Sequence, residues 1–274
     1  MSPRSLLSGQ RYAAAVVAAT SGGVVINPDD TAHTKGGYVE FIAATAFNAS
    51  GLLVSFLKNV TTVGNHLMDI AVGAAASEQI IVADLLFQRQ TSNAHSSILI
   101  PVAIPAGVRI SAREQCSSAS ETSSEFTMHI IAADADENFG MQRCVTYGAD
   151  TSDTGGLNID PGAVGNTKGS YVEVTSATTA AIKWLIVAIG NKKNAGVTDC
   201  RWLMDIAIGA AASEQIIIPD LSLGTDSAAD LFYPLFLGLP VDIPLGSRIA
   251  VRAQCSITDA TDRLFDIILY GVGG

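Results

Sequence analysis

The sequence predicts an all-β protein of two tandem antiparallel β-sandwich domains with a jelly-roll-like arrangement. Three observations support this prediction. First, a long segment occurs twice, because Leu67–Leu85 and Leu203–Leu221 are identical at sixteen of nineteen positions. Second, the segments with a clear period alternate with period two or are short β-branched runs, separated by turn residues. Third, strand and helix patterns do not alternate along the chain, which argues against a parallel α/β sheet.

The two copies align over most of their length. Thr34–Glu40 matches Thr167–Glu173 at an offset of 133, and the long match has an offset of 136. Pro101–Ile110 then matches Pro240–Ile249 at an offset of 139. Each increase falls in a polar stretch, where surface loops accept insertions more readily than buried strands do. The duplication therefore extends through whole domains.

These offsets place a first β-sandwich repeat at residues 22–135, a linker at 136–154 and a second repeat at 155–274. Residues 1–21 precede the first repeat and contain Gln10-Arg11, which recurs as Gln142-Arg143 before the second. We therefore expect an N-terminal arm or first strand here, not a secretory signal. No run reaches eighteen apolar residues, so no membrane partner is expected.

Turn residues divide the first repeat into eight expected strands. They are Gly23–Asn27, Gly37–Ala44, Leu52–Lys58, Leu67–Val72, Gln79–Phe87, Ile98–Ile104, Val108–Cys116 and Phe126–Ala132. Eight short strands are typical of an antiparallel sandwich or barrel, and eight per domain fits a jelly roll. The order of the strands in the sheets does not follow from the sequence.

Composition bears on the partners of the chain. It is 48% hydrophobic and 15% charged, below the roughly 25% charged residues of average domains. This favours surfaces covered by other subunits, so a homo-oligomer such as a trimer or hexamer is expected, and a monomer is the alternative. The net charge of −10 without a basic cluster argues against nucleic acid. The cysteines lack metal-ligand spacing and are expected to be free and mostly buried.

Each repeat has one strand with two arginines on the same face, because side chains alternate across a strand. The residues are Arg109 and Arg113 in the first repeat, and Arg248 and Arg252 in the second. Two readings remain open. The arginines form an interaction surface that meets acidic groups of a neighbouring subunit, or they form an intradomain ladder with Asp69 and Asp205 on an adjacent strand.

No set of residues suited to catalysis is evident. The histidines are scattered, lie only in the first repeat, and form no metal-binding pattern: His33, His66, His95 and His129. At an offset of 139, His129 aligns with Ile268. Glu78, repeated as Glu214, is expected to fix a turn through hydrogen bonds to the backbone. The sequence therefore predicts no enzyme, no cofactor and no metal site.

Carbohydrate binding is the competing interpretation, since β-sandwiches often host it through exposed aromatic rings. Both tryptophans lie in the second repeat. Trp184 is expected in the core or at an interface, whereas Trp202, with Tyr233, is the residue to test for glycan binding. The least repeated loop contains Lys192 and Lys193, which makes them further candidates for an interaction surface.

Two repeated segments carry a resemblance to a known group of proteins. They are Gly73–Ile81 with Gly209–Ile217, and Ile104–Gln115 with Ile243–Gln254. The chain resembles uncharacterised proteins encoded among bacteriophage structural genes. The resemblance spans both repeats, and no catalytic or binding residue carries over from it. It implies a non-enzymatic structural component of the virion, made in the host cytoplasm.

A capsid decoration (cement) protein or a tail-associated protein would act through contacts with itself and with other virion proteins. Because each chain supplies two similar domains, a trimer could match a pseudo-sixfold environment. The alternative is a carbohydrate- or receptor-binding module of a phage tail, whose partner would be a host surface glycan.

Overall fold

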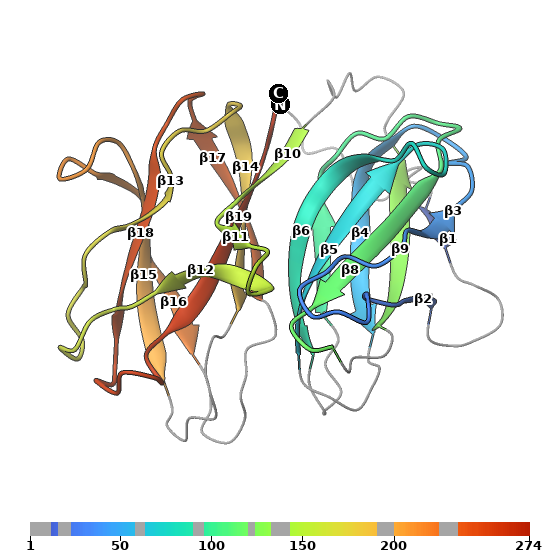
Figure 1. Ribbon diagram of the computed structural model, residues 1–274. Coiled ribbons are helices and arrows are strands. Elements are labelled where there is room, and N and C mark those ends of the chain that lie inside the picture. Colours follow the sequence, from blue (N-terminus) through green and yellow to red (C-terminus); the bar gives the residue numbers. More distant parts are fainter. Residues whose placement is uncertain are drawn as a thin grey trace.

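The structure is a computed structural model, and it describes residues 12–15, 23–57, 64–89, 96–119, 124–132, 143–190, 200–224 and 235–274. The two repeats lie side by side, the first drawn in blue to green and the second in yellow to red (Figure 1). All regular elements in the described residues are β-strands, and those that pair do so antiparallel. The prediction of an all-β fold is therefore confirmed.

All eight strands expected in the first repeat are present. They are β2 (Val24–Ile26), β3 (Val39–Ile42), β4 (Ala49–Leu57), β5 (Gly64–Val72), β6 (Gln79–Arg89), β7 (Ser96–Ile100), β8 (Ile110–Cys116) and β9 (Ser124–Ala132). Alternation in sequence becomes alternation in burial: in β9, Phe126, Met128 and Ile130 point into the core while the residues between them are partly exposed. Period two was therefore a reliable signal here.

The strand order is that of a jelly roll. We call the sheet in which β9 lies between β2 and β4, with β7 at its edge, sheet A; the order β3-β8-β5-β6 is sheet B. The first and last strands of the repeat are neighbours in sheet A, and β3 and β8, the next pair inwards, are neighbours in sheet B. Two such four-stranded sheets facing each other define the jelly-roll sandwich.

The second repeat has the same topology. Its strands are β12 (Gly155–Ile159), β13 (Val172–Thr175), β14 (Ile182–Gly190), β15 (Arg201–Ile208), β16 (Gln215–Gly224), β17 (Leu235–Ile243), β18 (Ile249–Cys255) and β19 (Phe265–Gly273). The strands β12, β19, β14 and β17 form sheet C, the counterpart of sheet A. The order β13-β18-β15-β16 forms sheet D, the counterpart of sheet B.

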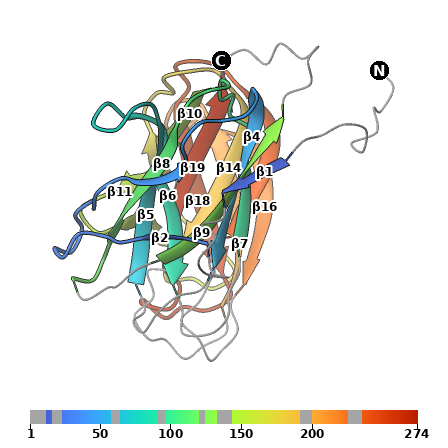
Figure 2. The same cartoon turned by 90° about the vertical axis from the view of Figure 1, so that its right-hand side faces the viewer.

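The segments before each repeat also form strands. β1 (Tyr12–Ala15) pairs with β9, as the reading of an arm or first strand allows, and it runs beside β9 in Figure 2. β10 (Arg143–Tyr147) pairs with β19, and β11 (Ala149–Asp150) pairs with β12. The expected linker at 136–154 is therefore wrong for its second half, because these residues complete sheet C.

The sheet register corrects one alignment made from the sequence. His129 pairs with Leu53 across β9 and β4, whereas Tyr270 pairs with Ile186 across β19 and β14. Since Leu53 and Ile186 are equivalent at the offset of 133, His129 corresponds to Tyr270 and not to Ile268. The turn before β19 is two residues longer than the turn before β9, and this raises the offset to 141.

Candidate functional site

A buried carboxylate organises the charged residues of the first repeat. Asp69 on β5 accepts hydrogen bonds from Lys35 Nζ (2.9 Å) and Arg113 Nε (3.0 Å), and Lys35 also pairs with Asp84. The Arg113 guanidinium lies 4.7 Å from the centre of the Tyr38 ring, a cation–π distance. The network ties β5, β6, β8 and the segment before β3 together.

The second repeat contains the same network. Asp205 accepts from Lys168 Nζ (2.8 Å) and Arg252 Nε (2.9 Å), and Arg252 stacks over Tyr171 at 4.6 Å. Burial acts to raise the pKa of Asp205, but hydrogen bonds from the Asp220 N–H, Lys168 and Arg252 outweigh it and lower that pKa. The intradomain ladder with Asp69 and Asp205 is therefore the arrangement that the structure contains.

Arg109 and Arg248 hold a tight turn in each repeat. Arg109 binds Glu40 Oε2 through Nε (2.8 Å) and Glu78 Oε1 through Nη1 (3.0 Å), and it also donates to Gly73 O. Arg248 makes the same contacts with Glu173, Glu214 and Gly209 O. Hydrogen bonds from its own backbone N–H and from Arg109 lower the pKa of Glu78. As expected for Glu78, these side chains fix a turn.

Neutralising Asp205 tests the strength of this network. We expect Asp205→Asn to lower the free energy of unfolding by about 2 kcal/mol, because two cations lose their shared partner. The folded pKa of Asp205 is depressed, so its contribution is present above the unfolded pKa of 3.8 and is lost as the pH falls through the lower folded value. Denaturant titrations between neutral pH and pH 3 check both points.

Asp69→Asn provides the matched control for that experiment, since it removes the same carboxylate from the other repeat. Equal unfolding free energies for Asp205→Asn and the wild type at neutral pH would contradict a stabilising role for the network.

Two further expectations about site residues have different outcomes. Trp202 does not lie on the surface: it is 1% exposed, donates from Nε1 to Arg263 O (2.8 Å) and packs edge-on against Phe265. The expectation that Trp202 belongs to an interaction surface is therefore wrong, because its position on β15 points into the core of the second repeat. Lys192, Lys193 and Tyr233 lie outside the described residues.

The junction between the repeats is a feature that the sequence analysis missed. The outward face of sheet C meets the β6–β7 side of the first repeat, where β6 contacts β10 and β14 and β7 contacts β17. Residues of that face belong to the same apolar cluster as the core of the first repeat: Ile186, Ala188, Ile268, Tyr270 and Val272. Sheet C thus closes one side of the first sandwich.

Tyr270 is the central residue of this junction. Its hydroxyl donates to Asp84 O (2.8 Å) and accepts from Leu86 N (2.8 Å), two backbone groups on the free edge of β6. Asp84 has φ 52°, which bends β6 and shifts its register against β5. Leu86 reaches β14 at Gly190, where an added Cβ would lie only 2.9 Å from Leu86 Cδ2.

A signal for this junction was present in the sequence. The run Ile182–Gly190 is apolar at nearly every position, whereas its counterpart Ala49–Leu57 includes Ser50 and Ser55 on the outward face. Strands buried on both faces read as continuous apolar runs. Comparing the two copies, and not only aligning them, would have identified sheet C as the doubly covered sheet.

Polar contacts extend the junction to sheet B. Gln115 Nε2 donates to Thr151 O and to Thr154 Oγ1, both at 2.8 Å, and Thr154 belongs to the turn between β11 and β12. The hydroxyl of Thr154 also lies 2.8 Å from Nδ1 of His33, a residue with φ 62°. Thr154 is buried by these contacts. The first repeat therefore contacts the second through both apolar packing and hydrogen bonds.

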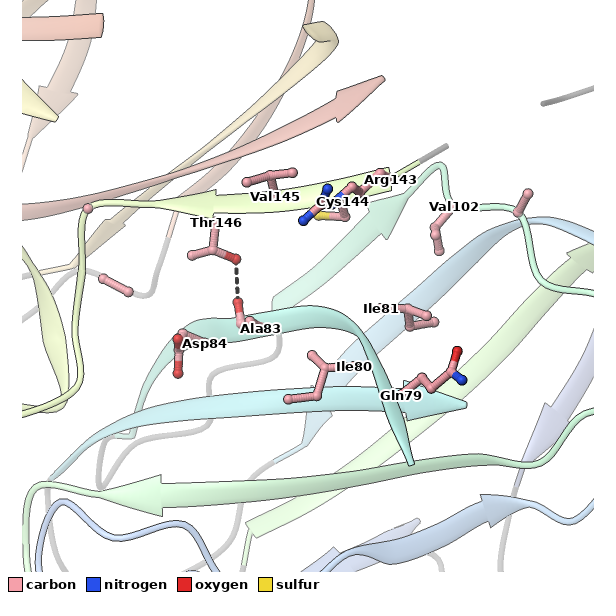
Figure 3. Close-up of a pocket in the computed structure, with 13 residues that line it drawn as sticks. Gln79, Ile80, Ile81, Ala83, Asp84, Val102, Arg143, Cys144, Val145 and Thr146 are labelled. Atoms are coloured by element: carbon pink, nitrogen blue, oxygen red, sulfur yellow. Dashed lines mark hydrogen bonds between the residues drawn. The ribbon is translucent and has the colours of Figure 1, made fainter. Parts of the chain in front are cut away.

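A pocket of about 830 Å³ opens between β6 and β10 (Figure 3). Its lining combines apolar side chains such as Ile81, Val102 and Val145 with Thr146, whose hydroxyl donates to Ala83 O (2.6 Å). Burial raises the pKa of the Cys144 thiol to about 12, so this thiol stays protonated at neutral pH. The described lining offers shape and hydrogen bonds, without an activated nucleophile.

A second cluster of titratable groups lies inside the first repeat. His66 is fully buried, stacks on Phe87, and places Nδ1 3.7 Å from Glu114 Oε2 and Nε2 3.6 Å from Cys116 Sγ. Burial alone would lower the pKa of His66, but the charge of Glu114 and the contact with Cys116 raise it to about 9. The second repeat has Trp202 and Ala253 at the equivalent positions.

No group of three or more metal-ligating side chains is found among the described residues. All four cysteines are free, and three of them are buried, as expected. Within the same residues no helix is long and apolar enough to cross a membrane.

No protein-family model and no curated protein matches this chain. Among solved structures it is similar to the N-terminal CBM22-1–CBM22-2 tandem domain of Paenibacillus barcinonensis Xyn10C, with 11% identity, a TM-score of 0.30, and coverage of 96% of this chain and 91% of that one. It is also similar to a putative secreted protein of Parabacteroides distasonis, with 9% identity, a TM-score of 0.23, and coverage of 97% and 89%.

Proposed function

We propose that this chain is a non-enzymatic structural component of a phage particle, a capsid decoration or tail-associated protein that acts through protein–protein contacts. The observation that carries the proposal is what the polar residues shared by both repeats contact. In each repeat the lysine, the two arginines and their carboxylate partners bind groups of that same repeat. Residues retained in both copies thus serve to hold strands and turns in place.

The junction between the repeats supports the same proposal. The core of the first repeat and the outward face of sheet C form one apolar cluster, so the two similar modules pack against each other. Jelly rolls build viral capsid proteins, and they also build lectins. For the glycan-binding alternative, Trp202 is no longer a candidate, because it is buried in the core of the second repeat. We therefore prefer the structural role to the glycan-binding alternative.

Immunogold electron microscopy tests the proposal. Antibodies against the purified chain are applied to phage particles purified from the host that carries this gene. We expect regular labelling of one part of the particle, removed when the antibody is first saturated with free chain. Unlabelled particles beside abundant chain in the particle-free lysate would contradict the proposal.

A further inference from the structure

The two repeats contact each other head to tail, through two different surfaces. Each surface has a second copy on the other repeat, and this second copy meets no other sheet in the described part of the chain. Internally, the β6–β7 side of the first repeat meets the outward face of sheet C in the second. The equivalent surfaces are the β16–β17 side of the second repeat and the outward face of sheet A in the first. A contact of this heterologous kind can recur between chains, giving a ring or a filament.

The β16–β17 side of the second repeat keeps the apolar character of its counterpart, but none of the described residues of another sheet covers it. Five core positions of the first repeat are buried: Val82, Leu85, Ile98, Ile100 and Val102. Their equivalents in the second repeat are apolar yet only partly buried: Ile218, Leu221, Leu237, Leu239 and Val241. The fold and the register are the same, so the difference arises because sheet C covers only the first set.

Hydrogen-bonding groups of the junction are also retained on the second repeat. Gln254 and Asn166 occupy the positions of Gln115 and His33, and Asn166 has a similar φ of 56°. The backbone agrees, because Asn166 N donates to Cys255 O just as His33 N donates to Cys116 O. In the described part of the chain, neither side chain has a hydrogen-bond partner. They lie where a hydroxyl equivalent to that of Thr154 would bind.

The outward face of sheet A retains an apolar surface with a rearranged shape. Leu53 and Ile131 replace Ile186 and Val272, and Leu99 is 49% exposed. On sheet C, Trp184 covers Gly238, since a Cβ there would lie 2.8 Å from the indole nitrogen. On sheet A the large and the small residue change places: Gly51 stands at the position of Trp184, Leu99 stands at the position of Gly238, and the two are in contact. The outward face of sheet A is therefore still apolar, but its protruding and recessed positions differ from those of sheet C.

We infer that the β16–β17 side of the second repeat docks the outward face of sheet A from a second copy of this chain. Ser222 stands where Leu86 inserts at the internal junction, so the contact between copies is less apolar than the one within the chain. The association is accordingly weaker than the internal junction and depends on concentration. The inference rests on the proposed structural role, and it supplies the self-association that such a role requires.

Opposite-face variants of the purified chain provide the test, with molecular mass followed by light scattering over a range of concentrations. Ser222→Lys changes the β16–β17 side, and Leu99→Lys changes the face of sheet A; both positions are exposed, so folding should be retained. We expect the average mass of the wild type to grow with concentration. The dissociation constant of each variant should be higher than that of the wild type by roughly thirtyfold or more. Leu245→Lys, at a 66% exposed turn, is the control that should behave as the wild type.

Mixing the two variants gives the decisive result. Each retains one intact surface, so an equimolar mixture should form a dimer of one of each and nothing larger. A wild type that stays monomeric up to millimolar concentration, or a mixture that stays monomeric, would overturn the inference. Particle labelling is a separate readout, so a monomeric chain found on particles would reject self-docking while leaving the proposed location intact.

Discussion

Replacing Tyr270 with alanine is expected to lower the free energy of unfolding by about 4 kcal/mol and to uncouple the two repeats. The ring is 1% exposed within the cluster that joins them, so its removal leaves a cavity between Ile186 and Val272 on one side and β6 on the other. Leu86 N and Asp84 O also lose their partner at the edge of β6. The Tyr270→Ala variant thus loses both packing and hydrogen bonds at the same place.

The distribution of tryptophan makes the uncoupling measurable. Both tryptophans lie in the second repeat, so their fluorescence follows that repeat, whereas far-ultraviolet circular dichroism follows all strands. In denaturant titrations the wild type should give coincident curves from the two probes, and Tyr270→Ala should give separate ones.

Two control variants separate the contributions to the loss of stability in Tyr270→Ala. Tyr270→Phe keeps the ring and should cost about 1 to 2 kcal/mol through the hydroxyl alone. His129→Ala changes the equivalent position on the outward face of sheet A, where no second repeat packs, and should cost less than Tyr270→Ala. Coincident curves for Tyr270→Ala at the wild-type midpoint would show that the junction does not couple the repeats.

The first repeat is expected to lose about 3 kcal/mol of stability as the pH rises from 6.5 to about 9. The folded pKa of His66, about 9, is above its unfolded value of 6.5, so its contribution is complete below pH 6.5. It disappears as the pH rises through the folded value, when the buried Glu114 carboxylate is left without a cation. Circular dichroism in denaturant across this range measures the loss.

An apolar replacement of the pair serves as the control. His66→Leu combined with Glu114→Met should abolish the alkaline loss, with neutral or increased stability at pH 7, because a buried ion pair often contributes no more than well-packed apolar groups. Without denaturant, the tryptophan fluorescence should change little over the same pH range, since both tryptophans lie in the second repeat, which has Trp202 and Ala253 at the positions of the pair. An unchanged alkaline slope in the double variant would assign the loss to another group.

The fold could be predicted from the sequence because the relevant signals are local. Alternation along β9 and turn residues at the ends of β5 and β6 fix strands within a few residues. β10 was missed because its pattern, Arg143–Tyr147, is short and its partner β19 lies more than a hundred residues away. Only tertiary pairing distinguishes such a segment from a linker.

The charged networks were partly foreseeable and the junction was not foreseen. Arg113 and Asp69 lie on adjacent strands, so their pairing follows from strand neighbourhood, while the contribution of Lys35 depends on how the segment before β3 crosses the sheet. Trp202 was misjudged because a tryptophan on an alternating strand is compatible with either face. Its burial is decided by Phe265, which is distant in sequence.

The position of β19 in sheet C has a consequence for synthesis on the ribosome. β19 lies between β14 on one side and β10 with β12 on the other, so sheet C cannot close until residues 265–273 have emerged. The first repeat has all its own strands once β9 is made. At about 5 to 20 residues per second, it then waits on the order of ten seconds with the edge of β6 uncovered. During that interval the backbone groups on the edge of β6 that Tyr270 later binds are open to mispairing with other strands.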